Sequence, residues 1–122
     1  EIKTAGDFEI SINRVDSMNP TTDKLYRATW YEKNGRFYVL CTKGIGVKSI
    51  NGRLFSHHGF SLNVNEGVCY YNLIDQCGFP KEQIEPITMQ KILGKELDLK
   101  EIKKRLVDNF SDVFERGVNY GL

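Results

Sequence analysis

Two short segments, His57–Gly59 and Cys77–Gly78, contain the residues of this 122-residue sequence whose types and spacing could do chemistry. The nucleophilic form of cysteine is the thiolate, and an ordinary thiol, with a pKa of about 8.5, is only slightly ionised at neutral pH. Cys77 therefore needs a cationic neighbour, and Lys43 in "KGIGV" is the first candidate. Gly78 lets the backbone approach a ligand and offer its N–H. These are the conditions that an acyl-transfer cysteine requires.

Each of these residues also has a purely structural interpretation. A lone cysteine is most often a small buried hydrophobe. Lys43 could equally be a solvated lysine at a sheet edge, and a histidine in a strand is more often structural. His58 is the second candidate partner, as a base or as a hydrogen-bond donor. Because His57 and His58 are sequential, a strand would place them on opposite faces, and only one could line a given pocket.

The glycines of Gly44–Gly46 do not form a phosphate-binding loop, because the third glycine and the following helix of that fingerprint are missing. Glycine inside a strand more often marks a bulge or the close approach of something bulky. If the ligand is a fatty acyl chain, these glycines make room for it, and the same holds for Gly59 with Ser61.

Composition excludes several classes of function. The formal net charge of +1 gives no bulk field for nucleic acid or a membrane surface, and no apolar run approaches the roughly 20 residues that span a bilayer. Three cysteines without C-x-x-C spacing, with only two histidines, predict neither a metal site nor a disulfide framework. We therefore expect no cofactor and a reducing compartment, cytoplasmic or mitochondrial.

The first part of the chain, about residues 8–65, reads as a meander of about four or five antiparallel strands. "FEISI" (Phe8–Ile12) alternates like a strand. "YRATWY" and "RFYVLC" flank Asn34-Gly35, and "GIGVKSI" and "RLFSHHGFSLNV" flank Asn51-Gly52; both dipeptides are strong hairpin signals. We expect this sheet to leave a long edge that another chain must cover.

The second part, about residues 66–117, reads as helical, with short helices in "GVCYYNLI" and in "TMQKIL", which Gly94 closes. Asp98 with Glu101 forms a capping-box pattern and predicts one amphipathic helix from Asp98 to Gly117. That helix should bury Leu106 and Phe110 and expose Lys103 and Lys104. The predicted fold class is α+β, one domain over residues 1–122, with helices on one face of the sheet.

The stretch "SHHGFSLNVN…YYNLIDQCGF" resembles the C-terminal half of the lipoate-pathway octanoyltransferases, which carry a His-Gly-Phe/Leu-Ala-Leu-Asn-Val-Asn strand followed by Pro-Cys-Gly. Gln76 replaces the proline here. "KGIGVKSI" and "ATWY" resemble the Ile-Gly-Val and Gly-Val-Trp-Val strands, and "EPITM" resembles the Val-Thr-Ser-Leu segment. The resemblance covers about residues 28–114.

That resemblance implies a mixed sheet with helices, related to biotin and lipoate ligases. It also implies transfer of an octanoyl group from acyl carrier protein to a lysine of a lipoyl domain, through a thioester on Cys77 whose pKa a nearby lysine lowers. The matching substrate-contacting triplets are Gly44, Ile45, Gly46 and Gly59, Phe60, Ser61.

Two features depart from the family pattern. An ungapped match places Cys41 at the position of the activating lysine, and Lys43, two residues on and roughly 6.6 Å along a strand, would point to the same face. The Arg-Gly-Gly and Thr-Tyr-His-Pro-Gly-Gln-like motifs of the N-terminal half have no counterpart, so a second chain or an N-terminal segment would have to complete the pocket. Three interpretations remain open: an acyltransferase part, a catalytically degenerate relative with a structural or assembly role, and an ATP-dependent ligase relative.

Overall fold

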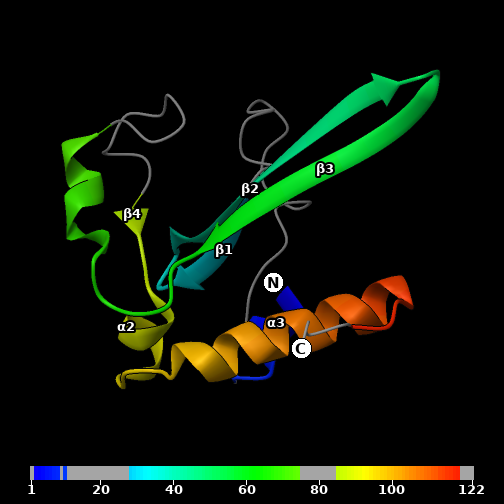
Figure 1. Cartoon of the computed structure of the whole chain (residues 1–122). Helices are drawn as coiled ribbons and strands as arrows, with labels where there is room; N and C mark the ends of the chain where they lie inside the picture. The colour runs from blue at the N-terminus through cyan, green and yellow to red at the C-terminus, as the bar shows by residue number, and fades with distance from the viewer. Residues whose placement is uncertain (1, 9, 11–27, 75–84, 119–122) are drawn as a thin grey trace.

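The computed structural model describes residues 2–8, 10, 28–74 and 85–118 (Figure 1). Its elements, in chain order, are α1 (Ile2–Gly6), β1 (Ala28–Lys33), β2 (Arg36–Ile50), β3 (Arg53–Leu62), the 3₁₀ helix η3 (Val68–Leu73), β4 (Glu85–Pro86), α2 (Met89–Leu93) and α3 (Leu99–Phe114). The sheet order is β1-β2-β3 with antiparallel pairing, and β4 pairs with β2 in parallel. The predicted α+β class, an open mixed sheet with helices, is confirmed.

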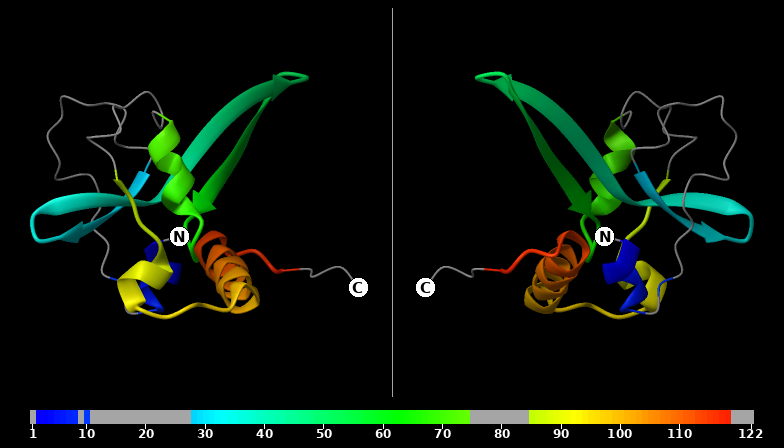
Figure 2. Two further views of the ribbon diagram at one scale, coloured as in Figure 1. Left: turned by 90° about the vertical axis from the view of Figure 1, so that its left-hand side faces the viewer. Right: turned by 90° about the vertical axis from the view of Figure 1, so that its right-hand side faces the viewer.

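Strand β2 is one continuous strand shared by two hairpins. The sequence prediction separated "RFYVLC" from "GIGVKSI", and this was wrong because no residue between them takes a turn conformation. Both Asn-Gly turns are confirmed, with φ of 54° and 74° at Asn34 and Gly35 and of 50° and 74° at Asn51 and Gly52. Positive φ at both central residues marks the turn type that matches strand twist. The two hairpins point in different directions (Figure 2).

The strand predicted at Phe8–Ile12 was wrong at its two described residues. Phe8 lies in a turn after α1, and Ile10 has no regular structure. The cause is local, because the backbone N–H groups of both residues donate to the carbonyl of Ala5, at 3.0 and 3.1 Å. The alternating side chains still serve the core, in which Ile10 is buried and Phe8 is partly buried.

The core joins the first hairpin to the helices. Its buried members, drawn from both ends of the chain, are Ala5, Ile10, Leu40, Ile87, Met89, Leu97 and Ile102. Helices α2 and α3 lie together along one side of the sheet (Figure 1). The β2–β3 hairpin extends away from this core, and every residue from Arg53 to Ser61 is exposed.

Helix α3 begins as predicted at Asp98, whose Oδ1 accepts from the Lys100 N–H at 2.8 Å. It ends at Phe114 and not near Gly117, because Glu115 is left-handed, with φ of 50°. The predicted exposure of Lys103 and Lys104 is confirmed.

The prediction that Leu106 and Phe110 are buried was wrong for Phe110, which is 50% exposed, while Leu106 is partly buried. Ile102 is the fully buried residue of α3, because only the first half of the helix reaches the core.

The two short helices were also predicted. The η3 turns occupy the "VCYYNL" segment, and α2 ends at Gly94, which takes the left-handed conformation (φ 71°). Within the described ranges, no helix combines the length and the apolarity needed to cross a membrane. In the same ranges, β2 pairs only with β3 beyond Thr42, so an open edge is present there; its cover by another chain stays a prediction.

Candidate active site

The β2–β3 ladder brings the two predicted substrate triplets together. In the register of this ladder, Gly44 lies directly opposite Gly59. Neither glycine has an atom within 4 Å of the place where a Cβ would stand. The pair therefore forms a strip of bare backbone that a thin, extended ligand could cross without meeting a side chain. The two motifs, one on each strand, thus meet within the β2–β3 hairpin, which is called the ribbon below.

The candidate residues nevertheless divide between the two faces of the ribbon. Cross-strand partners share a face, and faces alternate along each strand. One face carries Lys43, Ile45, His58 and Phe60, through the pairs Lys43–Phe60 and Ile45–His58. The other face carries Gly44, Gly46, Gly59 and Ser61.

His57 is a residue that sequence reasoning left aside. It is the cross-strand partner of Gly46. A Cβ built at Gly46 would lie 2.5 Å from both Cε1 and Nε2 of the His57 imidazole. The ring therefore lies over Gly46, on the face of the bare strip. The signal that could have found it is the register of the hairpin, which follows from the turn at Asn51-Gly52.

His58, the predicted base, faces helix α3. Its ring stacks on Phe110, with centroids 6.4 Å apart and planes 29° apart. Here β3 and α3 enclose a pocket of about 200 Å³ that is lined by His58, Phe60, Leu106, Asn109, Phe110, Val113 and Phe114. Two predicted site residues thus line an apolar pocket that the sequence did not foretell.

Cys41, at the position where the family pattern has its activating lysine, is only 1% exposed. Its Sγ lies 3.6 Å from the carbonyl oxygen of Thr42. Its cross-strand partner is Thr29, whose buried Oγ1 has no hydrogen-bond partner within the described part of the chain. A ligand does not reach Cys41 in this arrangement. Lys43 is the next residue on the same face and is partly exposed, as the sequence predicted for its orientation.

Cys77, Gly78 and Gln76 lie outside the described residues, so the distance between Cys77 and Lys43 stays untested. Among the residues that are described, no three His, Cys, Asp or Glu side chains gather as a metal site.

The asparagines of the "LNVN" segment hold the framework. Asn65 accepts from the backbone N–H of Leu97 at 3.0 Å and donates to its carbonyl at 2.9 Å. Asn63 donates to the carbonyl of Val39 at 3.3 Å. These bonds fix the chain after β3 against β2 and against the segment that leads into α3.

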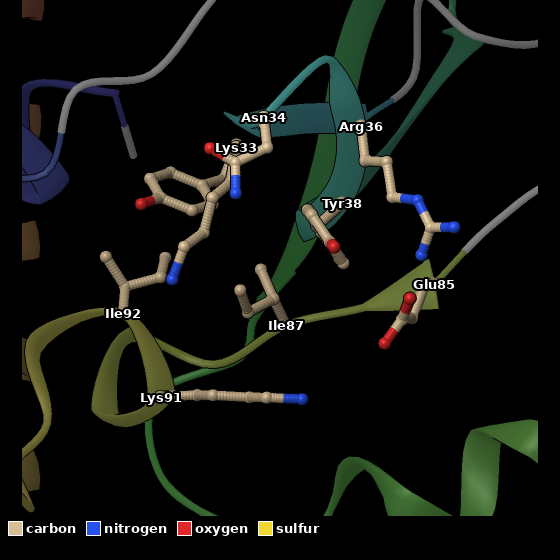
Figure 3. A pocket seen from close by; sticks show the side chains of 9 residues that line it. Lys33, Asn34, Arg36, Tyr38, Glu85, Ile87, Lys91 and Ile92 are labelled. Atoms are coloured by element: carbon tan, nitrogen blue, oxygen red, sulfur yellow. The ribbon is translucent and has the colours of Figure 1, made fainter.

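A second pocket, of about 390 Å³, opens beside the turn end of the first hairpin (Figure 3). It is lined by Tyr31, Lys33, Asn34, Arg36, Tyr38, Glu85, Ile87, Lys91 and Ile92. Figure 3 shows Tyr38 and Ile87 at its centre, between Lys33 on one side and Arg36 with Glu85 on the other. None of the predicted site residues lines it.

Comparison with known proteins finds relatives that are similar to this chain over part of their length. The chain is 41% identical over 76 residues to an octanoyltransferase of Caldanaerobacter subterraneus, a match that covers 62% of this chain and 30% of that protein. It is similar to octanoyltransferases. The octanoyltransferase of Parabacteroides distasonis is 36% identical over 83 residues, 68% of this chain and 35% of the relative. That of Koribacter versatilis is 30% identical over 118 residues, 96% of this chain and 41% of the relative.

The resemblance to octanoyltransferases that the sequence motifs indicated is thereby confirmed. No protein-family profile matches the chain. The chain spans less than half the length of these octanoyltransferase relatives: the matches cover 30%, 35% and 41% of the three proteins.

Proposed function

We propose that this chain is part of an octanoyltransferase and carries its acyl-accepting cysteine, Cys77. The observation that supports this most directly is the pairing of Lys43 with Phe60 and of Ile45 with His58, which brings the proposed cation, the proposed base and one residue of each substrate triplet to one face of the β2–β3 hairpin. The names of the relatives support octanoyl transfer as the reaction class. The domain would then be partial over residues 1–122, and the rest of the pocket would come from a second chain or an N-terminal segment.

The reaction would proceed in two exchanges. The Cys77 thiolate attacks the carbonyl carbon of an octanoyl thioester on acyl carrier protein; the new C–S bond forms while the old one breaks, and the carrier leaves as a thiolate. The neutral amine of a lipoyl-domain lysine then attacks the Cys77 thioester. A C–N bond forms, Cys77 leaves as a thiolate, and the proton of the amine passes to His58. The backbone N–H of Gly78 would stabilise the oxyanion.

Lys43 is the cation that this scheme assigns to the thiolate. It shares a face with Cys41, the position that the family pattern gives to its lysine, whereas Cys41 itself is buried. A positive charge near a thiol favours the thiolate. The scheme uses no cofactor, and its thiol chemistry suits a reducing cytoplasmic or mitochondrial compartment.

The alternative is a catalytically degenerate relative with a structural or assembly role. One observation favours it: the position of the activating lysine holds the buried Cys41. In that case Lys43 and Cys77 would be ordinary surface and packing residues.

The test uses a chimaera in which this chain replaces the matching segment of the Koribacter octanoyltransferase, because that match spans 96% of this chain. Octanoyl–acyl carrier protein should add one octanoyl group to Cys77, located by mass spectrometry of the peptides, and Cys77→Ser should remove it. Lys43→Met should raise the pH at which the adduct forms. Lys48→Met is the matched control, because Lys48 lies on the opposite face of β2. An adduct that persists in Cys77→Ser, or the same pH shift in both lysine variants, would contradict the proposal, and a folded chimaera without any adduct would favour the structural role.

A further inference from the structure

The two faces of the β2–β3 ribbon differ in chemistry. One face carries bare glycine backbone and His57, with Ile50 and Phe55 nearer the turn. The other carries most of the large apolar side chains of the ribbon, namely Ile45, Val47, Leu54 and Phe60. Alternation of this kind is typical of a sheet with one buried face.

That apolar face is exposed. Leu54 is 77% exposed, Ile45 72% and Val47 62%. Burying each such side chain is worth about 1.5–3 kcal/mol, and contiguous exposed apolar surface marks an interaction site. A ribbon of two strands is also marginally stable by itself. We therefore expect the apolar face of the ribbon to pack against polypeptide outside the described residues.

The second half of α3 supplies another apolar wall. Phe110 and Phe114 are 50% and 53% exposed, and their ring centroids lie 4.4 Å apart. The pocket of about 200 Å³ lies between the two walls and is lined by Phe60 together with these rings. Beyond it the ribbon rises away from the helix (Figure 2). Ribbon and helix thus each present an apolar wall, and the pocket is where side chains of both walls come together.

We propose that this ribbon–helix surface, made of Ile45, Val47, Leu54, Phe60, Phe110 and Phe114, is buried by the polypeptide that makes up the remainder of an octanoyltransferase-sized protein. The relatives are longer than this chain, since a match over 118 residues covers only 41% of one of them. The remainder of such a protein needs an interface with this chain, and this surface combines exposed apolar side chains of the β2–β3 hairpin and of α3. The proposal rests on the same family likeness as the proposed function, but not on any chemistry of Cys77.

Hydroxyl-radical footprinting of the isolated chain and of the chimaera tests this directly. In the chimaera, oxidation of Leu54, Phe60 and Phe110 should fall by at least about fivefold, because their side chains leave solvent. Leu73 on η3 is the matched control: it is 79% exposed, close to the 77% of Leu54, and its oxidation should stay within about twofold. Leu54→Asp should lower the melting temperature of the chimaera, and Leu73→Asp should not.

Equal oxidation of the three side chains in both proteins would overturn the proposal, and so would equal protection of Leu73. Protection that appears in the isolated chain as its concentration rises would assign the surface to a second copy of the chain instead. A chimaera that does not fold, although the parent octanoyltransferase does, also counts against it. Cys77→Ser should lose the octanoyl adduct yet keep the protection, so the two proposals fail separately.

Discussion

The side-chain amide of Asn65 makes both a donor and an acceptor hydrogen bond with the backbone of Leu97, 32 residues along the chain. This pair of hydrogen bonds resembles the pairing of two residues in a β-sheet, except that one partner is a side-chain amide. It ties the end of the ribbon to the segment before α3. Leu97 is only 8% exposed, so water is a poor substitute for the amide.

Asn65→Ala should lower the free energy of unfolding by about 2–3 kcal/mol, because it leaves a partly buried N–H and a partly buried carbonyl without partners. Urea denaturation measures the change. Asn63→Ala, which removes one longer bond, at 3.3 Å to the carbonyl of Val39, should cost less, about 1 kcal/mol. If the two variants lose equal stability, the Asn65 bonds have no special weight.

Alanine substitutions along α3 should show where the helix meets the core. Ile102→Ala should cost about 2–5 kcal/mol, since Ile102 is 2% exposed and lies within the core. Leu106→Ala should cost less, and Phe110→Ala the least in the isolated chain, because Phe110 is 50% exposed. Chemical denaturation of the three variants gives the order, and a loss for Phe110→Ala as large as that for Ile102→Ala would contradict it.

Gly46→Ala and Gly44→Ala form a matched pair on one face of β2. Alanine in place of strand glycine should stabilise by about 0.5–1 kcal/mol where space allows, as at Gly44. At Gly46 the new methyl meets the His57 ring, which must move, so the gain should be lost. In a His57→Ala background both substitutions should stabilise alike. A double-mutant cycle measures this coupling, and a coupling energy of zero would mean that the ring does not occupy that space.

The sequence predicted the hairpins, the α3 cap and the short helices, because turn dipeptides, capping residues and helical periodicity act locally. The failures arise where a local pattern fits more than one structure or where burial depends on distant elements. Alternation at Phe8 and Ile10 also fits a turn packed on the core, and the burial of Phe110 depends on how far the sheet extends beneath α3. The short β4 was missed because two residues carry no pattern.

For the candidate site, the sequence placed the two triplets but not their register. The pairing of Gly44 with Gly59 and the position of His57 over Gly46 depend on cross-strand geometry. The pocket between Phe60 and Phe110 depends on the packing of α3 against the ribbon, which no local signal encodes. The sequence therefore indicates which residues could do chemistry more readily than it indicates which face of the sheet each of them occupies.

The turn at Asn51-Gly52 has a consequence well away from itself. Since the side-chain period of a strand is two, inserting or deleting one residue at this turn would shift the β3 register and exchange the face that each of its residues presents. Gly59 would then move to the side of α3 and Phe60 to the side of the bare backbone. The number of residues in this solvent-exposed turn thus fixes the register of the whole ribbon. Homologous turns should therefore tolerate changes of residue type far better than changes of length.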